Sequence, residues 1–314
     1  MAILLALLTA CVYGTADYMG GRATRRVPAV VVTFVGQIGG LVVLLVAALT
    51  SGIPVPSAHD WWWSAAAGLV GSTGLLAFYR AMSSGHMTVA APIAAVLNAS
   101  IPVIAGLLMG ERPGVLALVG IPLALVSIAL VSDVLGPGHH RAPRNIVLMA
   151  AVGGSMFGLI LVFLHQTSDG SGVWPVLIMR FVSTPYMALL IMRNRPTFAD
   201  VRANKVTVFG SGILDSLANW FYVLAVRHGL LSVVSVIVTL YPASTMVLAT
   251  TVDKERIIRS QAVGIALAAV ALVLIAELDP ETSDDDGLLP AGEATAAPCS
   301  GAHDASQTRT PRMA

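Results

Sequence analysis

Ten long apolar stretches, separated by short polar loops, dominate the hydrophobic pattern of the chain. They cover residues 1–20, 28–50, 61–80, 89–109, 114–132, 146–165, 173–192, 206–226, 230–251 and 260–276. Each is close to the roughly 20 apolar residues that a helix needs to cross the hydrocarbon core of a bilayer. Prolines, glycines and charged residues mark the loops between them. The pattern therefore predicts an all-α polytopic membrane protein with ten transmembrane helices.

The amino-acid composition agrees with a membrane protein. Of the 314 residues, 56% are hydrophobic and only 11% are charged, and the mean hydropathy is +0.81. Soluble domains carry about 25% charged residues, so this chain has too few polar side chains to cover a soluble fold of its size. Its two cysteines, Cys11 and Cys299, lie far apart in dissimilar segments, which gives no indication of a disulfide framework.

Two groups of five predicted helices are separated by the longest loop of the chain. The first group covers residues 1–132, the loop covers 133–145, and the second group covers 146–276. Acidic residues then outnumber basic ones in 277–314, which is also rich in Ala, Pro, Gly, Ser and Thr. Such a segment cannot bury enough apolar area to offset the entropy lost on folding, so we expect a disordered tail.

An internal repeat relates the two groups. When the chain is shifted by 144 residues, several glycines and a glutamate of the first group fall on identical residues of the second. Because each group has five helices, the second group begins on the opposite side of the membrane. This predicts two inverted five-helix repeats, an architecture that many secondary transporters share. The matched residues are Gly14 with Gly158, Gly68 with Gly212, Gly85 with Gly229, and Glu111 with Glu255.

The Lys and Arg residues of the loops agree with this inversion, which places corresponding loops on opposite faces. Residues 22–26 after the first helix include three arginines, whereas the corresponding loop after the sixth helix has Asp169 and no Lys or Arg. Loops after odd-numbered helices carry nearly all the Lys and Arg, and loops after even-numbered helices carry only Arg112 and Arg227. Since an excess of Lys and Arg marks cytoplasmic loops, the charge count places both termini outside the cytoplasm.

Short motifs at equivalent places in the two halves carry a family resemblance. "FYRAMSSG" and "FYVLAVRHG" follow the third and eighth helices, and "GERPG" and "DKERI" precede the last helix of each half. With the two five-helix halves and the mid-helix Gly14 and Gly158, the pattern resembles the drug/metabolite transporter superfamily, in its EamA-like branch. The resemblance covers residues 1–276.

This resemblance implies ten helices around a cavity at the bilayer midplane. Helices one to four and six to nine would line the path, and helices five and ten would be peripheral. It also implies that both termini are cytoplasmic, contrary to the charge count, so the orientation stays open.

Two ionisable residues lie near the middle of predicted helices, where the cost of dehydrating a charge makes each a candidate site. Asp215 in the eighth helix shares a face with Asn219 and Tyr222, and Arg180 is central in the seventh. One interpretation is a buried ion pair that locks the two helices together. The other is a proton or substrate site, because burial favours the neutral carboxyl and a nearby arginine favours the carboxylate. A pair that opens during transport would satisfy both interpretations.

Further polar residues suit the lining of a cavity. Asp17 shares a face with Tyr13 in the last turn of the first predicted helix. There it could reach water, pair with Arg22, or lie at the mouth of a cavity. Alone, each of the other polar residues is more typical of a hydrogen bond between helices than of a ligand contact. Together they predict a mixed polar and aromatic pocket, whose residues are Thr33, Gln37, Asn98, Trp220, Tyr222, Ser232, Ser235, Thr239 and Pro242.

The sequence lacks the motifs of enzymes and of metal or cofactor sites. It has neither an HExxH zinc motif nor a GxxxxGK[ST] nucleotide motif, and "GSTG" at residues 71–74 is not the GxSG of an intramembrane protease. His139 and His140 stand without further ligands, which is typical of a solvated loop. We therefore expect no enzyme activity, no cofactor and no metal.

The sequence favours a secondary transporter that exports a small organic metabolite or drug-like solute. We expect it to be proton-coupled and to work by alternating access across the cytoplasmic membrane. The alternative is a channel or a non-transporting membrane scaffold, and a membrane enzyme is the least favoured class. The expected partners are a small-molecule substrate, protons and the lipid bilayer, with no nucleic acid and a homodimer left open. A single net negative charge in the pocket would suit a cationic substrate, whereas Arg180 would suit a substrate with a carboxylate. The identity of the substrate therefore stays open.

Overall fold

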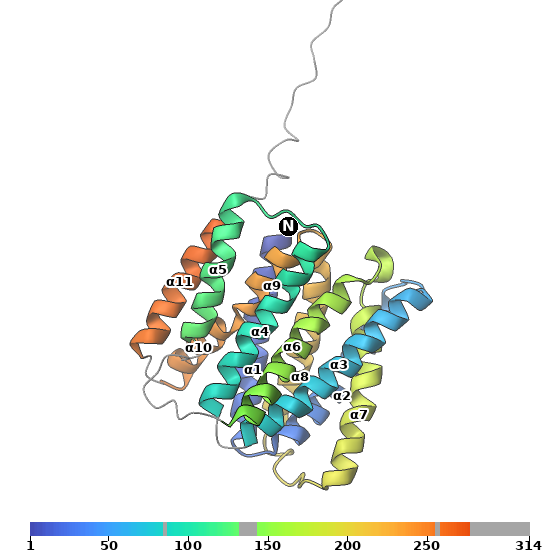
Figure 1. Cartoon of the computed structure of the whole chain (residues 1–314). Helices are drawn as coiled ribbons and strands as arrows, with labels where there is room; N and C mark the ends of the chain where they lie inside the picture. Colours follow the sequence, from blue (N-terminus) through green and yellow to red (C-terminus); the bar gives the residue numbers. More distant parts are fainter. Residues whose placement is uncertain (84–86, 132–142, 255–257, 277–314) are drawn as a thin grey trace, which may run out of the picture. The chain divides into compact units, whose positions relative to one another are not determined.

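All regular structure in the described residues, 1–83, 87–131, 143–254 and 258–276 of the computed structural model, is helical (Figure 1). Most of the predicted loop 133–145, the predicted tail 277–314 and Glu255 lie outside the described residues. A single turn of 3₁₀ helix covers Asp169–Ser171. The α-helices are α1 (Ala2–Thr24), α2 (Ala29–Thr50), α3 (Ala58–Ser83), α4 (Met87–Leu108), α5 (Val115–Val131), α6 (Arg144–His165), α7 (Trp174–Asn194), α8 (Lys205–Val226), α9 (Leu231–Thr239), α10 (Tyr241–Val252) and α11 (Arg259–Ala276).

Six helical segments in the described residues are long and apolar enough to cross a membrane by length and composition. In a bilayer every backbone polar group needs an internal partner, and a continuous helix supplies one. These segments are α1, α2, α6, α7, α8 and the joined segment Leu231–Val252, and the shorter apolar helices cover Ile93–Leu108, Val115–Val131 and Arg259–Ile275. The chain thus has the helical build of a polytopic membrane protein.

Prolines and one left-handed residue define several helix ends. Pro28 and Pro143 directly precede α2 and α6, and Pro175 lies in the first turn of α7. Proline is tolerated at these positions because the first backbone N–H groups of a helix have no partner within it. At the other end of α7, Arg195 adopts φ 45°, the left-handed conformation that commonly terminates a helix.

The ninth apolar stretch is divided, where the sequence pattern predicts one continuous helix over 230–251. α9 ends at Thr239 and α10 begins at Tyr241. Pro242 has no N–H to donate to the carbonyl of Val238, so the helical hydrogen-bond ladder is interrupted there. The N–H of Leu240 instead donates to the carbonyl of Ile237 at 3.2 Å. The physical cause of the break is therefore already visible in the sequence.

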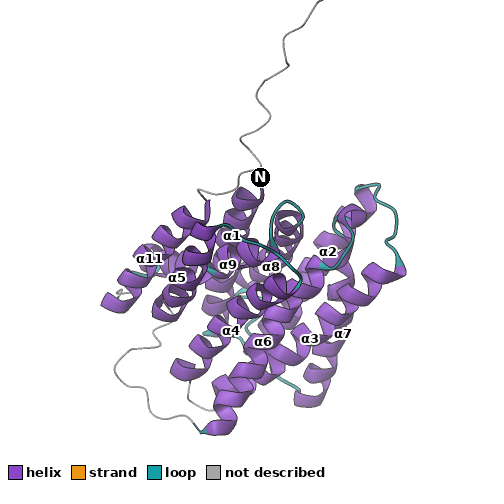
Figure 2. Ribbon diagram, turned by 45° about the horizontal axis from the view of Figure 1, so that its top comes forward, coloured by secondary structure: helices purple, strands orange, loops and turns teal. Residues whose placement is uncertain are grey.

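The helices pack in pairs drawn from opposite halves of the chain. α8 packs against α1 and α2, and α6 packs against α3 and α4. α7 contacts α2 and α3, while α1 contacts α9 and α10. α5 and α11 pack against each other at one edge (Figures 1 and 2). The fully buried side chains of Leu44, Leu177, Tyr222 and Ile237 belong to the main core between these helices.

Candidate functional site

Arg180 of α7 and Asp215 of α8 form an ion pair, as one of the two interpretations of the sequence predicts. Nη2 of Arg180 donates to Oδ2 of Asp215, and its Nε donates to the hydroxyl of Ser216 at 3.1 Å. The two partners differ in exposure, since 8% of the Arg180 side chain is accessible and 42% of the Asp215 side chain. The arginine is thus held by two groups inside the protein, while the carboxylate faces accessible space.

Close packing of α2 on α8 positions this pair. A Cβ atom on Gly212 would lie 2.0 Å from the carbonyl carbon of Gly36, so the two backbones touch. One turn further along, a Cβ on Gly40 would lie 1.9 Å from the hydroxyl of Ser216, the group that binds Arg180. Small residues are what allow helices in a membrane to approach this closely.

Three other predicted site residues on α8 lie nearby but contact different groups. The amide of Asn219 donates to the backbone carbonyl of Asp215 at 2.8 Å and does not reach the carboxylate. Tyr222 is fully buried, and its hydroxyl donates to the carbonyl of Leu161 at 2.8 Å. Trp220 stacks on Phe221, with ring centroids 6.2 Å apart. The geometry thus places Tyr222 in the core, joining α8 to α6.

Asp17 and Tyr13 bring α1 into the same neighbourhood. α1 packs against α8, which carries Asp215, and the ring of Tyr13 lies 5.9 Å from that of Tyr241. α1 continues to Thr24, so Asp17 is not in its last turn, contrary to the shorter helix that the sequence predicts. In this structure Asp17 is not paired with Arg22.

Arg22 pairs elsewhere, at the end of α1. Its Nη1 lies 3.1 Å from Oδ1 of Asp253, and Nη1 of Arg25 lies 3.5 Å from the other carboxylate oxygen of that residue. Asp17 itself is exposed and has no hydrogen bond or ion pair to any residue that the structure describes. A cavity of about 300 Å³ opens beside it, lined by Asp17, Val131, Tyr241, Pro242, Thr245, Met246 and Ala249.

Gln37 and Asn98 occupy different surroundings. Gln37 lies on α2 between Gly36 and Gly40, which contact α8, and its side-chain oxygen is buried without a hydrogen-bond partner in the described residues. A buried acceptor without a partner is uncommon and leaves Gln37 able to bind a polar group. Asn98 is half-buried on α4, where its backbone carbonyl lies against Gly158 of α6.

Tyr241 is the residue of this region that the sequence analysis missed. It follows the break in the ninth apolar stretch and lines the cavity beside Asp17. Ser244, one turn on, donates to the carbonyl of Ala10 at 2.9 Å. A Cβ on Gly14 would lie 1.8 Å from that serine hydroxyl, so the glycine permits α10 to approach α1. Pro242, which belongs to the predicted pocket, is the sequence signal that could have indicated its neighbour Tyr241.

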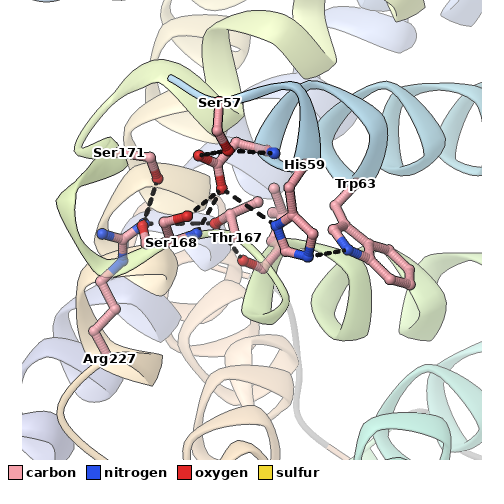
Figure 3. A network of polar contacts seen from close by, with 9 residues as sticks. Ser57, His59, Trp63, Thr167, Ser168, Ser171 and Arg227 are labelled. Atoms are coloured by element: carbon pink, nitrogen blue, oxygen red, sulfur yellow. Dashed lines mark hydrogen bonds and ion pairs between the residues drawn. The ribbon is translucent and has the colours of Figure 1, made fainter. Parts of the chain in front are cut away.

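A second polar network joins three loops at one end of the helices (Figure 3). Asp60, at the start of α3, accepts hydrogen bonds from the N–H of Ser168 at 2.6 Å, from its hydroxyl at 2.9 Å and from the hydroxyl of Ser57 at 3.1 Å. Arg227 donates to the hydroxyl of Ser171 at 2.8 Å and to the backbone carbonyl of Asp169. Loops far apart in the chain are thereby tied together.

The ionisation of Asp60 reflects these hydrogen bonds. Burial by itself raises the pKa of Asp60, but the hydrogen bonds from Ser168 and Ser57 lower it by more, and the pKa is below its usual value. At the same end of the helices, Glu111 accepts from the N–H groups of Leu231 at 2.5 Å and Ser232 at 2.9 Å. Glu111 therefore caps the N-terminus of α9, where the helix dipole also favours a negative charge.

No group of three or more His, Cys, Asp or Glu side chains that could hold a metal ion occurs in the described ranges. Three of the predicted candidates lie in two places: Arg180 and Asp215 form the pair between α7 and α8, and Asp17 lines the cavity formed by α1, α5 and α10. At the first place, the carboxylate of Asp215 can take up a proton in place of its ion pair with Arg180. The second can hold a solute with an apolar body.

Comparison with known proteins identifies the family. The model of the EamA-like transporter family matches residues 1–133 and 144–276. One solved structure, described only as "Crystal structure of protein", has a TM-score of 0.73 and 17% identity, covering 90% of this chain and 99% of its own. At that identity the likeness concerns the fold alone. A search of curated proteins finds no match. Because the family model covers most of the sequence, the chain belongs to the EamA-like transporter family.

Proposed function

We propose that this chain is a proton-coupled secondary transporter that exports a small organic solute across the cytoplasmic membrane by alternating access. Family membership makes it a multi-pass membrane transporter of the drug/metabolite type with a small-molecule substrate. Our proposal adds four points to the family assignment: the coupling to protons, the direction of transport, the membrane and the residues that bind the proton and the solute.

The unequal burial of the Arg180–Asp215 pair is the observation that carries the proposal. Arg180 is enclosed and also bound to Ser216, so it stays in place when its partner changes charge. Asp215 is accessible, so a proton or a solute can reach its carboxylate. Protonation of Asp215 would neutralise one member of the pair and weaken the link between α7 and α8. An ion pair that opens and closes in this way couples proton uptake to helix movement.

An inverted repeat of residues 1–132 and 146–276, ten spans in all, is part of the proposal. The helix contacts support it, because they persist when each helix is exchanged for its counterpart in the other half. The α1–α8 contact corresponds to α6–α3, the α2–α8 contact to α7–α3, and the α10–α1 contact to α4–α6. The family model also matches each half separately. Inverted repeats of this kind typically enclose a substrate site near the membrane midplane.

The close contacts of two matched glycines support the same repeat. Gly14 lies against Ser244 and Thr245, and Gly158 lies against Ile101. A shift of 144 residues carries Gly14 to Gly158 and Ile101 to Thr245. The two halves therefore use equivalent positions for equivalent contacts between helices.

The two ends of the helices differ in a way that alternating access requires. At one end, Asp60, Arg227 and Glu111 tie loops and helix ends together. The Asp17 cavity lies toward the opposite, arginine-rich end. A second cavity of about 190 Å³ lies at that end, lined by Arg22, Arg25, Arg26, Asn204, Thr207 and Asp253. A transporter closed at one end and hollow at the other is in one of its two end states.

Flux measurements in proteoliposomes test the proposal. Amino acids, sugars and lipophilic cations are offered in turn under an imposed pH gradient, and we expect one class to be transported. Asp215→Asn should reduce gradient-driven flux to the level of empty liposomes, because the variant has no carboxylate to protonate. Asp200→Asn is the matched control, since in the described part of the chain only the backbone carbonyl of Asp200 makes hydrogen bonds. Native gradient-driven flux in Asp215→Asn would overturn the proton-coupling assignment.

A further inference from the structure

The cavity beside Asp17 has a mainly apolar wall with one acid in it. Its apolar lining comes from Val131 at the end of α5 and from Pro242, Met246 and Ala249 on α10. At about 300 Å³ it falls at the lower end of the volumes typical of sites for small organic ligands. The cavity can therefore enclose the apolar part of a small solute next to a carboxylate.

Asp17 has no counterion among the described residues of this region. Arg180 pairs with Asp215, and both Arg22 and Arg25 pair with Asp253. Asp17 has neither an ion pair nor a hydrogen bond within the residues that the structure describes. A carboxylate inside a membrane span is costly unless a counterion accompanies it. A mobile cation can supply this charge where the protein does not.

The Thr245 hydroxyl in the cavity does not favour an anion. The Thr245 hydroxyl lies 3.2 Å from the carbonyls of both Gly14 and Tyr241, so its proton is already engaged. Tyr241 adds an aromatic ring, whose face attracts cations. The break at Pro242 places this ring beside Asp17, because α10 begins at Tyr241 and packs against α1.

We propose that the Asp17 cavity binds an amphiphilic organic cation, with the ammonium group at the Asp17 carboxylate and the apolar body against α5 and α10. This inference rests on the proposed transport function and names the substrate class of that transporter. It assigns the two carboxylates separate roles, with Asp17 binding the solute and Asp215 binding the proton. Carboxylate solutes are excluded from this cavity, since the negative charge of Asp17 repels them.

Equilibrium binding to the purified, detergent-solubilised protein tests this assignment without any gradient. The probe is radiolabelled benzyltrimethylammonium, and the competitor is neopentylbenzene, which has the same shape with carbon in place of the charged nitrogen. We expect saturable binding of the cation and no competition by the neutral compound. Asp17→Asn should weaken binding by roughly tenfold, because it removes the negative charge that attracts the cation. Asp17→Glu should retain binding, and Asp200→Asn should match the native protein.

Two results would overturn the inference. One is native affinity in Asp17→Asn, and the other is equal competition by the neutral compound, a measurement that needs only the native protein. The outcome is also separable from that of the proposed function. Binding that depends on Asp17, without gradient-driven flux of any solute, contradicts the transport proposal alone. Proton-coupled flux of another solute, without cation binding, contradicts the inference alone.

Discussion

Asp17 and Asp215 are both carboxylates inside long apolar helices, and α1 and α8, which carry them, pack against each other. Their surroundings differ in the counterion and in the neighbouring cavity. Asp215 has a buried counterion, Arg180, whereas Asp17 faces an apolar cavity and has no ion-pair partner in the described ranges. A carboxylate with a fixed counterion changes the local charge by taking up a proton, and one without can recruit a mobile cation. On our two proposals, the counterion of an acid in an apolar helix determines the role of that acid more than its exposure does.

Among the substitutions that test this comparison, replacement of Arg180 should have the largest effect. Arg180→Gln leaves Asp215 without a counterion, as Asp17 already is, and keeps a polar side chain near Ser216. We expect proton-coupled flux to fall by about 10- to 100-fold, because a hydrogen bond between charged groups contributes about 1.5–3 kcal/mol and Asp215 is partly accessible to solvent. Flux in proteoliposomes under a pH gradient measures this, with Arg180→Lys as the control that keeps the charge. Flux within about twofold of native in Arg180→Gln would remove the pair from the coupling mechanism.

A substitution at the α2–α8 contact tests whether the pair needs its rigid setting. In Gly212→Ala the new Cβ meets the backbone of Gly36, which cannot move aside as a side chain would. We expect a loss of about 2–3 kcal/mol in stability from this overpacking, together with weaker coupling. Thermal unfolding in detergent, followed by helical circular dichroism, measures the loss. Gly21→Ala is the matched control, since nothing lies within 4 Å of a Cβ there, and equal stability of the two variants would contradict the account.

Asp60 adds a third carboxylate to the comparison, one whose negative charge is stabilised by hydrogen bonds. Because its pKa is lowered in the folded protein, its contribution to stability is complete above the unfolded value of about 4. The contribution is lost as the pH falls through the lower, folded value. Asp60→Ala should cost about 2 kcal/mol near pH 7, since the donors on Ser168 and Ser57 lose their acceptor.

Thermal unfolding of this variant at several pH values gives the measurement. Asp60→Asn, which keeps one acceptor oxygen, should lose less stability than Asp60→Ala. Both variants should retain the native dependence of flux on the pH gradient, because Asp60 lies outside the two candidate sites. A changed gradient dependence in Asp60→Asn would show that this end of the helices takes part in coupling.

Sequence reasoning reached the Arg180–Asp215 pair because the cost of an intramembrane charge makes such residues conspicuous and restricts their partners. The same reasoning placed Asp215 on one face with Asn219, since helical periodicity determines which residues share a face. The helix windows also agree with the structure to within a few residues at most ends. These are local properties, and the local sequence specifies them.

Contacts between distant segments could not be predicted in this way. Arg22 pairs with Asp253, a residue 231 positions away that no periodicity connects to it. Tyr222 shares a face with Asp215, but its hydroxyl reaches the carbonyl of Leu161 on α6, which removes it from accessible space. Tyr241 was missed for the same reason, because its place beside Asp17 depends on the contact of α10 with α1. Only the break at Pro242 had a local signal.

Proton movement driven by the solute tests the central claim most directly. Proteoliposomes that contain a pH-sensitive dye receive a transported solute with no pH gradient imposed, and the internal pH and the internal solute are followed together. The account predicts that the native protein changes the internal pH as the solute moves down its own concentration gradient, and that any solute movement through Asp215→Asn occurs without a change in pH. Equal numbers of protons moved per solute in Asp215→Asn and in the native protein would contradict it.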